Sequence, residues 1–281
     1  GPIGEWSTSE ATSFYELFYD KGKFDEDLTG WDSGRVTTMH GMFSFAYSFN
    51  SDLSSFDTSR VRMMYDMFSS ATDFNGDLSS FDTSRVASMR SMFSKASSFN
   101  RNLSSFDTSL VGSMCGMFYY ANSFNGDVSS FDTSLVAEMG AMFDHAYSFN
   151  RDLSSFDTSL VRSMGHMFWV ASSFNKDLSS FDTSLVTNMA YMFSSAISFN
   201  GDLSSFDTQF VLSMEGMFYE ATSFNRDLSS FDVSRVTSMQ SHGGMFEHAI
   251  SFNQCLEWNI TNGVDTSKMF DNSPGRISSE C

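Results

Sequence analysis

A period of 25 residues runs through nearly all of this 281-residue chain. One copy, residues 74–98, reads FNGDLSSFDTSRVASMRSMFSKASS. Its leading phenylalanine occurs at nine positions spaced by 25 residues, from Phe24 to Phe224, and the next, Phe252, follows after 28. A fixed period of this length is typical of a solenoid, in which each repeat buries its apolar side against its neighbours. The sequence therefore predicts one elongated repeat domain.

The repeat pattern divides the chain into four parts. These are a leader (1–10), an N-terminal capping half-repeat (11–23), nine repeats (24–251), and a C-terminal cap with its tail (252–281). A three-residue insertion near 242–244 is expected to bulge outward, because the apolar pattern continues on both sides of it. The three cysteines do not follow the period, and a disulfide between Cys255 and Cys281 is one pairing that would clamp the cap. The tail from Pro274 is expected to be loose.

Two kinds of element are predicted within each repeat. In residues 61–71 the apolar side chains are separated by three, three, one and three positions, which indicates one face of a short helix. Residues 77–81 fit a strand, with Leu78 and Phe81 pointing inward, and Asn75 is expected to form a ladder that satisfies backbone groups. The predicted fold class is therefore α/β: a right-handed, leucine-rich-repeat-like solenoid with one short strand and one short helix per coil.

Composition narrows the class of function. The chain has 34 acidic and 16 basic residues and a net charge of −18, which argues against nucleic acid as a partner. No apolar run approaches the roughly 18–20 residues of a membrane span. Of the 20 methionines, 18 occupy two repeat positions, so they are interpreted as core residues. No catalytic motif is found, and an enzyme is not expected.

The repeat unit FNxDLSSFDTSxVxxMxxMFxxAxS resembles a surface-protein repeat of about 25 residues found in mycoplasma and Listeria lipoproteins and in marine microalgae. It also resembles the BspA-like class of leucine-rich repeats, with Val86, Met89 and Phe93 at matching positions. The surface-protein family commonly has tryptophan where this chain has Phe81, while Trp31 keeps the usual residue. The resemblance implies a leucine-rich-repeat-like solenoid, secreted or surface-exposed and often linked to adhesion. It carries over no catalytic residues.

Two files of aspartates, one residue per repeat, run along the predicted stack. The first file is interpreted as the better candidate for calcium, held by carboxylates and carbonyls of neighbouring coils. Its members considered as metal ligands are Asp52, Asp77, Asp127, Asp152, Asp177, Asp202 and Asp227. The second file, which includes Asp82, has the position of a helix cap. The alternative for both files is local hydrogen bonding in turns.

Interaction surfaces are expected where the repeats differ. The most aromatic variable positions contribute Tyr119, Tyr120, Trp169 and Tyr219, which are the candidate binding residues. The alternative is that they pack between adjacent helices. The position before each repeat valine is apolar in five successive repeats, so it forms either a partner groove or a buried flank. Its apolar members are Leu110, Leu135, Leu160, Leu185 and Phe210.

These observations favour a non-enzymatic binding or adhesion module that is extracellular or attached to a cell surface. Its expected partner is a protein or glycan on a cell surface or in a matrix. Two alternatives stay open. One is a structural spacer stabilised by calcium, and the other is an ice-binding solenoid that uses the regular files of serine and threonine hydroxyls.

Overall fold

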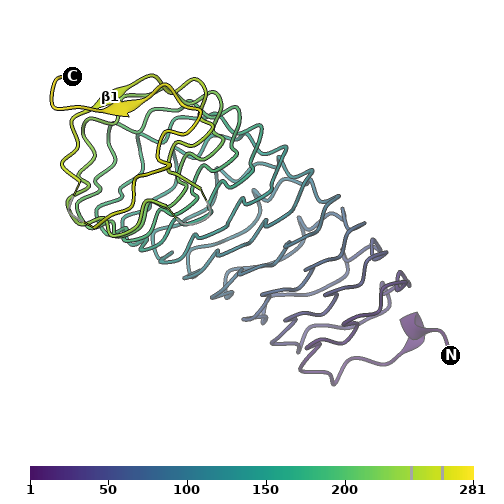
Figure 1. Cartoon of the computed structure of the whole chain (residues 1–281). Helices are drawn as coiled ribbons and strands as arrows, with labels where there is room; N and C mark the ends of the chain where they lie inside the picture. The colour runs from purple at the N-terminus through teal and green to yellow at the C-terminus, as the bar shows by residue number, and fades with distance from the viewer. Residues whose placement is uncertain (241–242, 261–262) are drawn as a thin grey trace.

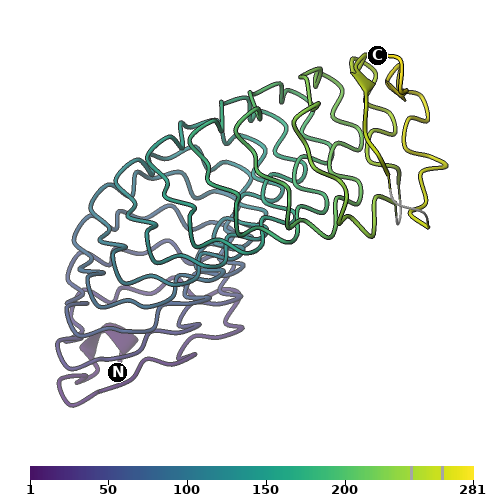
Figure 2. The same cartoon turned by 90° about the vertical axis from the view of Figure 1, so that its left-hand side faces the viewer.

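The computed structural model shows a stack of similar coils that bends into an arc, with the two termini at opposite ends (Figures 1 and 2). It describes residues 1–240, 243–260 and 263–281. The regular elements lie at the ends of the stack. They are the 3-10 helix η1 (Ile3–Glu5) and the strands β1 (Cys255–Leu256) and β2 (Arg276–Ile277), which pair in parallel.

The predicted α/β fold is wrong. No α-helix occurs in the described residues, and the strand expected at residues 77–81 is absent. Single parallel bridges occur instead at another position of the repeat, for example from Ser88 to Ser113 and from Ser113 to Glu138. The repeat therefore builds a solenoid whose coils consist of turns and isolated bridges.

The segment expected to be a helix folds as a series of β-turns. We call residues 86–96 and their equivalents the turn segments. The amide of Met92 donates to the carbonyl of Met89, and the amide of Ala96 donates to that of Phe93. Amides between them bond to the next coil: that of Phe93 donates to the carbonyl of Met117 at 2.9 Å. Hydrogen bonds within and between coils thus alternate along the segment.

The spacing of the coils explains why a helix does not form. An α-helix with its side chains is about 10 Å across. Phe93 lies 5.6 Å from Phe68 and 5.7 Å from Phe118, measured between ring centroids in successive coils. Ser91 and Lys95 also have φ of 51° and 58°, which lies outside the right-handed helical region. Successive β-turns place the same apolar residues inward as a helix would. The apolar spacing in the sequence therefore fits both a helix and a series of turns.

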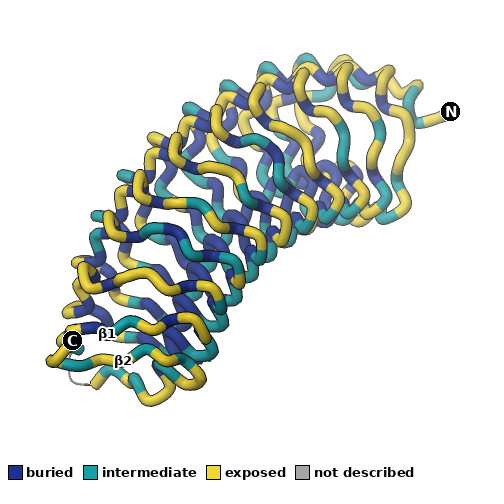
Figure 3. Tube along the Cα trace, turned by 90° about the horizontal axis from the view of Figure 1, so that it is seen from above, coloured by how far each residue is buried: buried dark blue, intermediate teal, exposed yellow. Residues whose placement is uncertain are grey.

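The core consists largely of stacked phenylalanine rings. Two rings face each other within each coil, such as Phe93 and Phe99, and these pairs lie 3.7–4.1 Å apart along the stack. Leu78 and Phe81 are buried, and so are the 18 methionines at the two repeat positions. The predicted core is confirmed, and Figure 3 shows buried residues recurring at matching places along the stack.

The coils stand closer together on one side than on the other. Ring spacing between coils is 5.5–5.8 Å in the file of Phe93 and 5.8–6.0 Å in the file of Phe99. We call residues 77–84 and their equivalents the Asp segments. They carry a third file of rings, in which Phe131 and Phe156 lie 6.4 Å apart between centroids. The turn segments, whose backbones bond to each other, therefore lie on the concave side of the arc.

Polar side chains complete the bonding between coils. The Oδ1 atom of Asn75 accepts from the amide of Asn100 at 3.0 Å, and the same bond recurs along the stack as far as Asn253. The predicted asparagine ladder is confirmed. Thr83, which is buried, donates from Oγ1 to the carbonyl of Asp107 at 2.8 Å. No buried side-chain nitrogen or oxygen in the described residues lacks a partner.

The C-terminal cap is held by a disulfide and by strand pairing. The possible pairing of Cys255 with Cys281 is present as a disulfide, with Cα atoms 5.5 Å apart. The expectation of a loose tail after Pro274 is wrong, because Arg276 and its neighbour pair with β1 in a parallel register. The residue His242 of the expected insertion lies outside the described residues.

Candidate functional site

Both aspartate files serve the turns in which they lie. In the first file, Asp77 Oδ1 accepts from the amide of Ser79 at 2.9 Å. In the second, Asp82 Oδ1 accepts from the amide of Ser84 at 3.0 Å. Backbone and then side-chain hydrogen bonds from Ser79 lower the pKa of Asp77, and bonds from the Ser84 side chain and backbone lower the pKa of Asp82. Local hydrogen bonding therefore accounts for both files, although we expected it chiefly for the second.

In the described residues, no cluster of possible ligands supports calcium binding by the first file. The described part of the chain contains no group of three or more His, Cys, Asp or Glu residues that could hold a metal ion. Asp177 Oδ1 accepts from the amide of Asp202 at 3.0 Å, so a carboxylate also links neighbouring coils. Calcium at this file stays an untested alternative to local hydrogen bonding.

The threonine hydroxyls of the predicted ice-binding files are turned inward. Thr83, Thr108 and Thr133 are each buried and donate to a backbone carbonyl of the next coil. The exposed hydroxyls of the Asp segments belong to serines, and several of these are bonded to aspartates, as Ser79 is to Asp77. The geometry thus gives the threonine file a structural role.

The apolar file before the repeat valines is exposed. The fractional exposure of its five members lies between 39% and 53%, which rules out the buried flank as its environment. At its C-terminal end the guanidinium of Arg235 lies 5.2 Å from the ring centroid of Phe210. This file lies between the turn segments and the Asp segments of the repeat, next to buried valines such as Val136.

The four predicted aromatic residues fall into two groups, and all four are half-buried. Tyr120 stacks on His145 of the next coil with ring centroids 3.9 Å apart, and Tyr119 packs edge-on against Tyr120 at 4.6 Å. Packing between coils, the alternative interpretation, therefore describes Tyr120, and Tyr119 packs against it within the same coil. The elements that pack are turns, however, and not helices.

A buried carboxyl lies beside this group. Asp144 is 2% exposed, and burial raises its pKa to about 8. Its Oδ1 contacts Nδ1 of His145, whose own pKa is lowered by burial. At neutral pH the pair is therefore largely uncharged, and its role is to support the rings of Tyr120 and its neighbours.

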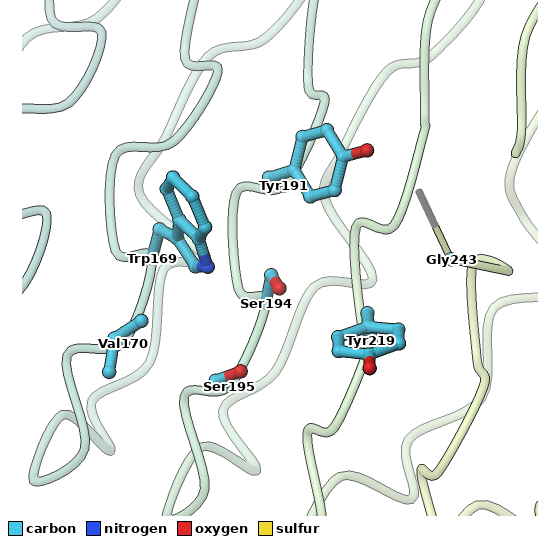
Figure 4. Close-up of a pocket in the computed structure, with 7 residues that line it drawn as sticks. All are labelled: Trp169, Val170, Tyr191, Ser194, Ser195, Tyr219 and Gly243. Atoms are coloured by element: carbon cyan, nitrogen blue, oxygen red, sulfur yellow. The ribbon is translucent and has the colours of Figure 1, made fainter. Parts of the chain in front are cut away.

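Trp169 and Tyr219 instead line a pocket on the concave side (Figure 4). Its volume is about 330 Å³. The third ring in its wall is Tyr191, which the sequence analysis missed. Other repeats have Gly, Ala, Ser, Asp or His at the position of Tyr191, so an aromatic residue there was the available signal. The other described residues in its lining are Val170, Ser194, Ser195 and Gly243.

Glycines position two of the three rings. A Cβ atom on Gly216 would lie 2.6 Å from Cε1 of Tyr191, and one on Gly243 would lie 2.4 Å from Cδ2 of Tyr219. Each ring thus lies directly over a glycine in a neighbouring coil. A side chain at the position of that glycine would displace the ring. Trp169 lies 5.9 Å from Tyr191 between ring centroids, at an interplanar angle of 36°.

The pocket has aromatic walls, and acidic side chains lie beside it. Ser195 donates from Oγ to Glu220 Oε2 at 2.9 Å. Burial raises the pKa of Tyr219, and the charges of Glu220 and Glu247 raise it further. None of the described residues that line the pocket is a lysine or an arginine. The pocket therefore disfavours anionic ligands.

Within the described residues, the indole nitrogen of Trp169 has no hydrogen-bond partner, whereas Nε1 of Trp31 and of Trp258 donates to backbone carbonyls. Figure 4 shows this nitrogen on the side of the indole that faces Ser194 and Tyr219. The pocket thus offers a directed hydrogen-bond donor beside apolar walls.

The family model described as "Mycoplasma protein of unknown function, DUF285" matches residues 1–106, 98–184, 152–242 and 176–276. No curated protein matches the chain. A similar solved structure, titled "Crystal structure of TLR13-ssRNA13 complex", is 9% identical, with a TM-score of 0.25. That alignment covers 97% of this chain and 50% of the other, so the chain spans half the length of that protein.

In the part of the chain that the structure describes, no helix has the length and apolar character needed to cross a bilayer.

Proposed function

The chain belongs to the DUF285 family, and on this premise we propose that it is a non-enzymatic binding or adhesion module. Its binding surface is the concave side of the turn segments, and its partner is a protein or glycan on a cell surface or in a matrix. The observation that carries the proposal is the pocket between Trp169, Tyr191 and Tyr219. A half-buried aromatic pocket in a repeat scaffold is a typical anchor for a partner.

An extracellular or cell-surface location is part of the proposal. The disulfide between Cys255 and Cys281 supports it, because such bonds persist mainly in oxidising compartments. The net charge of −18 and the regular polar surface of the Asp segments would keep an exposed domain soluble.

An array of surface glycans and matrix proteins tests the proposal. We expect at least one ligand to bind the wild-type chain and to be lost in Trp169→Ala. The matched control is Tyr47→Ala, which removes an aromatic side chain that is 45% exposed and lies in an early coil. Binding that is equal in all three proteins, or absent from the whole array, would remove the support for a binding module.

A further inference from the structure

We infer that the pocket between Trp169, Tyr191 and Tyr219 binds a sugar ring of a neutral glycan. This inference rests on the proposed binding function of the same surface and names the chemistry of its ligand. Three features of the pocket carry it: the aromatic walls, the free indole donor, and the negative surrounding.

The aromatic walls fit the apolar face of a pyranose. The π faces of aromatic rings carry partial negative charge, and the axial C–H groups of a sugar ring present a weakly positive surface. The rings come from three successive coils, so they are spread along the stack and can contact more than one side of a ligand. The glycines below Tyr191 and Tyr219 fix these rings against the backbone, which reduces the ordering needed on binding.

The donor of Trp169 selects a ligand with acceptor oxygens. A ligand that covers the indole must accept a hydrogen bond from Nε1, because an unpaired buried donor is unfavourable. A hydroxyl or ring oxygen of a sugar meets this need at the edge of a stacked face. A purely apolar ligand would cover the rings equally well but would leave the donor unpaired.

Charge and size limit the ligand further. The described lining of the pocket contains no lysine or arginine, and Glu220 and Glu247 lie beside it, so carboxylated or sulfated sugars would be repelled. A volume of about 330 Å³ lies at the lower end of the range for ligand pockets. The pocket therefore suits a single uncharged ring, held as one unit of a longer glycan.

Calorimetric titration with defined tetrasaccharides tests this inference. The neutral probes are cellotetraose, laminaritetraose, mannotetraose and chitotetraose, and the anionic probes are tetragalacturonate and a heparin tetrasaccharide. We expect at least one neutral probe to bind, with little dependence on salt, and neither anionic probe to bind. Trp169→Ala should weaken binding at least tenfold, and Trp169→Phe, which keeps a ring but lacks the N–H, should weaken it by a smaller factor.

Two controls separate ligand contacts from folding. Tyr119→Ala changes the same repeat position as Trp169 two coils away and should leave the affinity unchanged. Thermal melting of each variant shows whether the stack is intact. Stronger binding of the anionic probes, or neutral binding that survives Trp169→Ala, would overturn the inference.

The two proposals fail in different ways. If the array finds a protein ligand that depends on Trp169 and no neutral probe binds, the glycan inference is wrong and the binding function stands. If neither experiment finds a ligand that depends on Trp169, both are wrong.

Discussion

The Asp segments and the turn segments differ in how much they vary along the stack. The Asp segments repeat nearly the same residues and the same hydrogen bonds from coil to coil, as at Asp77 and Asp127. The outward positions of the turn segments change in almost every coil, and they include Lys95, His145 and Glu220 at one repeat position. Both segments bury the same core, so the difference concerns only their outer surfaces.

The way each segment bonds to its neighbours explains this difference. In the Asp segments the side chains themselves make bonds between coils, so replacing Thr83 would remove one of these bonds. In the turn segments the backbone amides make the bonds between coils, as Phe93 does with Met117. Outward side chains of the turn segments are therefore free to vary, and binding specificity is expected to reside there.

The largest expected effect comes from the shared core. Phe143→Ala removes a ring that lies 3.8 Å from Phe149 and 5.8 Å from Phe168, between centroids. We expect a loss of about 3–5 kcal/mol in the free energy of unfolding. Tyr147→Ala in the same coil removes a side chain that is 38% exposed and should cost less than about 1 kcal/mol. Chemical denaturation that shows equal losses for both variants would contradict the account of the core.

The asparagine ladder should be the next most sensitive feature. Asn150→Ala removes the oxygen that accepts from the amide of Asn175 at 3.1 Å, and we expect a cost of about 1–3 kcal/mol. Asn150→Asp keeps an acceptor, as Asp25 does for Asn50 at the start of the ladder, and should cost less. Urea denaturation of the two variants checks this order. An alanine variant as stable as the aspartate variant would show that the ladder does not stabilise the stack.

The buried carboxyl of Asp144 predicts a dependence on pH within the turn segments. Its pKa is raised to about 8 in the folded chain, so folding favours the protonated form. Stability should then fall as the pH rises above the unfolded pKa, and the loss should be complete beyond about pH 8. Between pH 6.5 and 8 the loss is about 2 kcal/mol, at about 1.4 kcal/mol per pH unit.

Asp144→Asn is the control for this prediction, because it keeps the shape of the side chain and does not titrate. Thermal melting from pH 6.5 to pH 8.5 should show a decline in the wild type that is absent in the variant. Parallel curves for the two proteins would place the pH dependence elsewhere.

The smallest expected effect concerns the Asp segments and calcium. Each aspartate of the first file already bonds to its own turn, as Asp77 does to Ser79. We therefore expect the melting temperature in excess calcium and in EDTA to differ by less than about 2 °C. Calcium that did bind, in large excess over its dissociation constant, would instead stabilise the folded chain by several kcal/mol and shift the melting temperature by more than this. A large increase with calcium would establish the first file as a cation site and favour the spacer function.

Much of this architecture could be predicted from the sequence. The period gave the stack, the inward residues such as Phe81 and Val86, and the asparagine ladder. The helix could not be excluded, because an apolar spacing of three and four positions fits both a helix and successive turns. What decides between them is the distance between coils, which depends on contacts such as Phe68 with Phe93 that no single repeat contains.

The candidate site was predicted in part. Trp169 and Tyr219 were selected because they stand at a variable position, and they do share a pocket. Tyr191 was missed because its position, two residues before the repeat phenylalanine, was not among the variable positions considered. Tyr119 and Tyr120 were selected on the same grounds, yet they pack against each other and His145. Variability along the repeat thus identifies the surface but not the residues that form its pocket.

The most direct test of the account compares one residue on each surface. A glycan that binds the wild type is titrated against Trp169→Ala and against Asp177→Asn, with melting curves for both variants. The account predicts that Trp169→Ala loses at least tenfold in affinity while its stack stays folded, and that Asp177→Asn binds as the wild type does. Binding that survives the loss of Trp169, or that depends on Asp177, would contradict it.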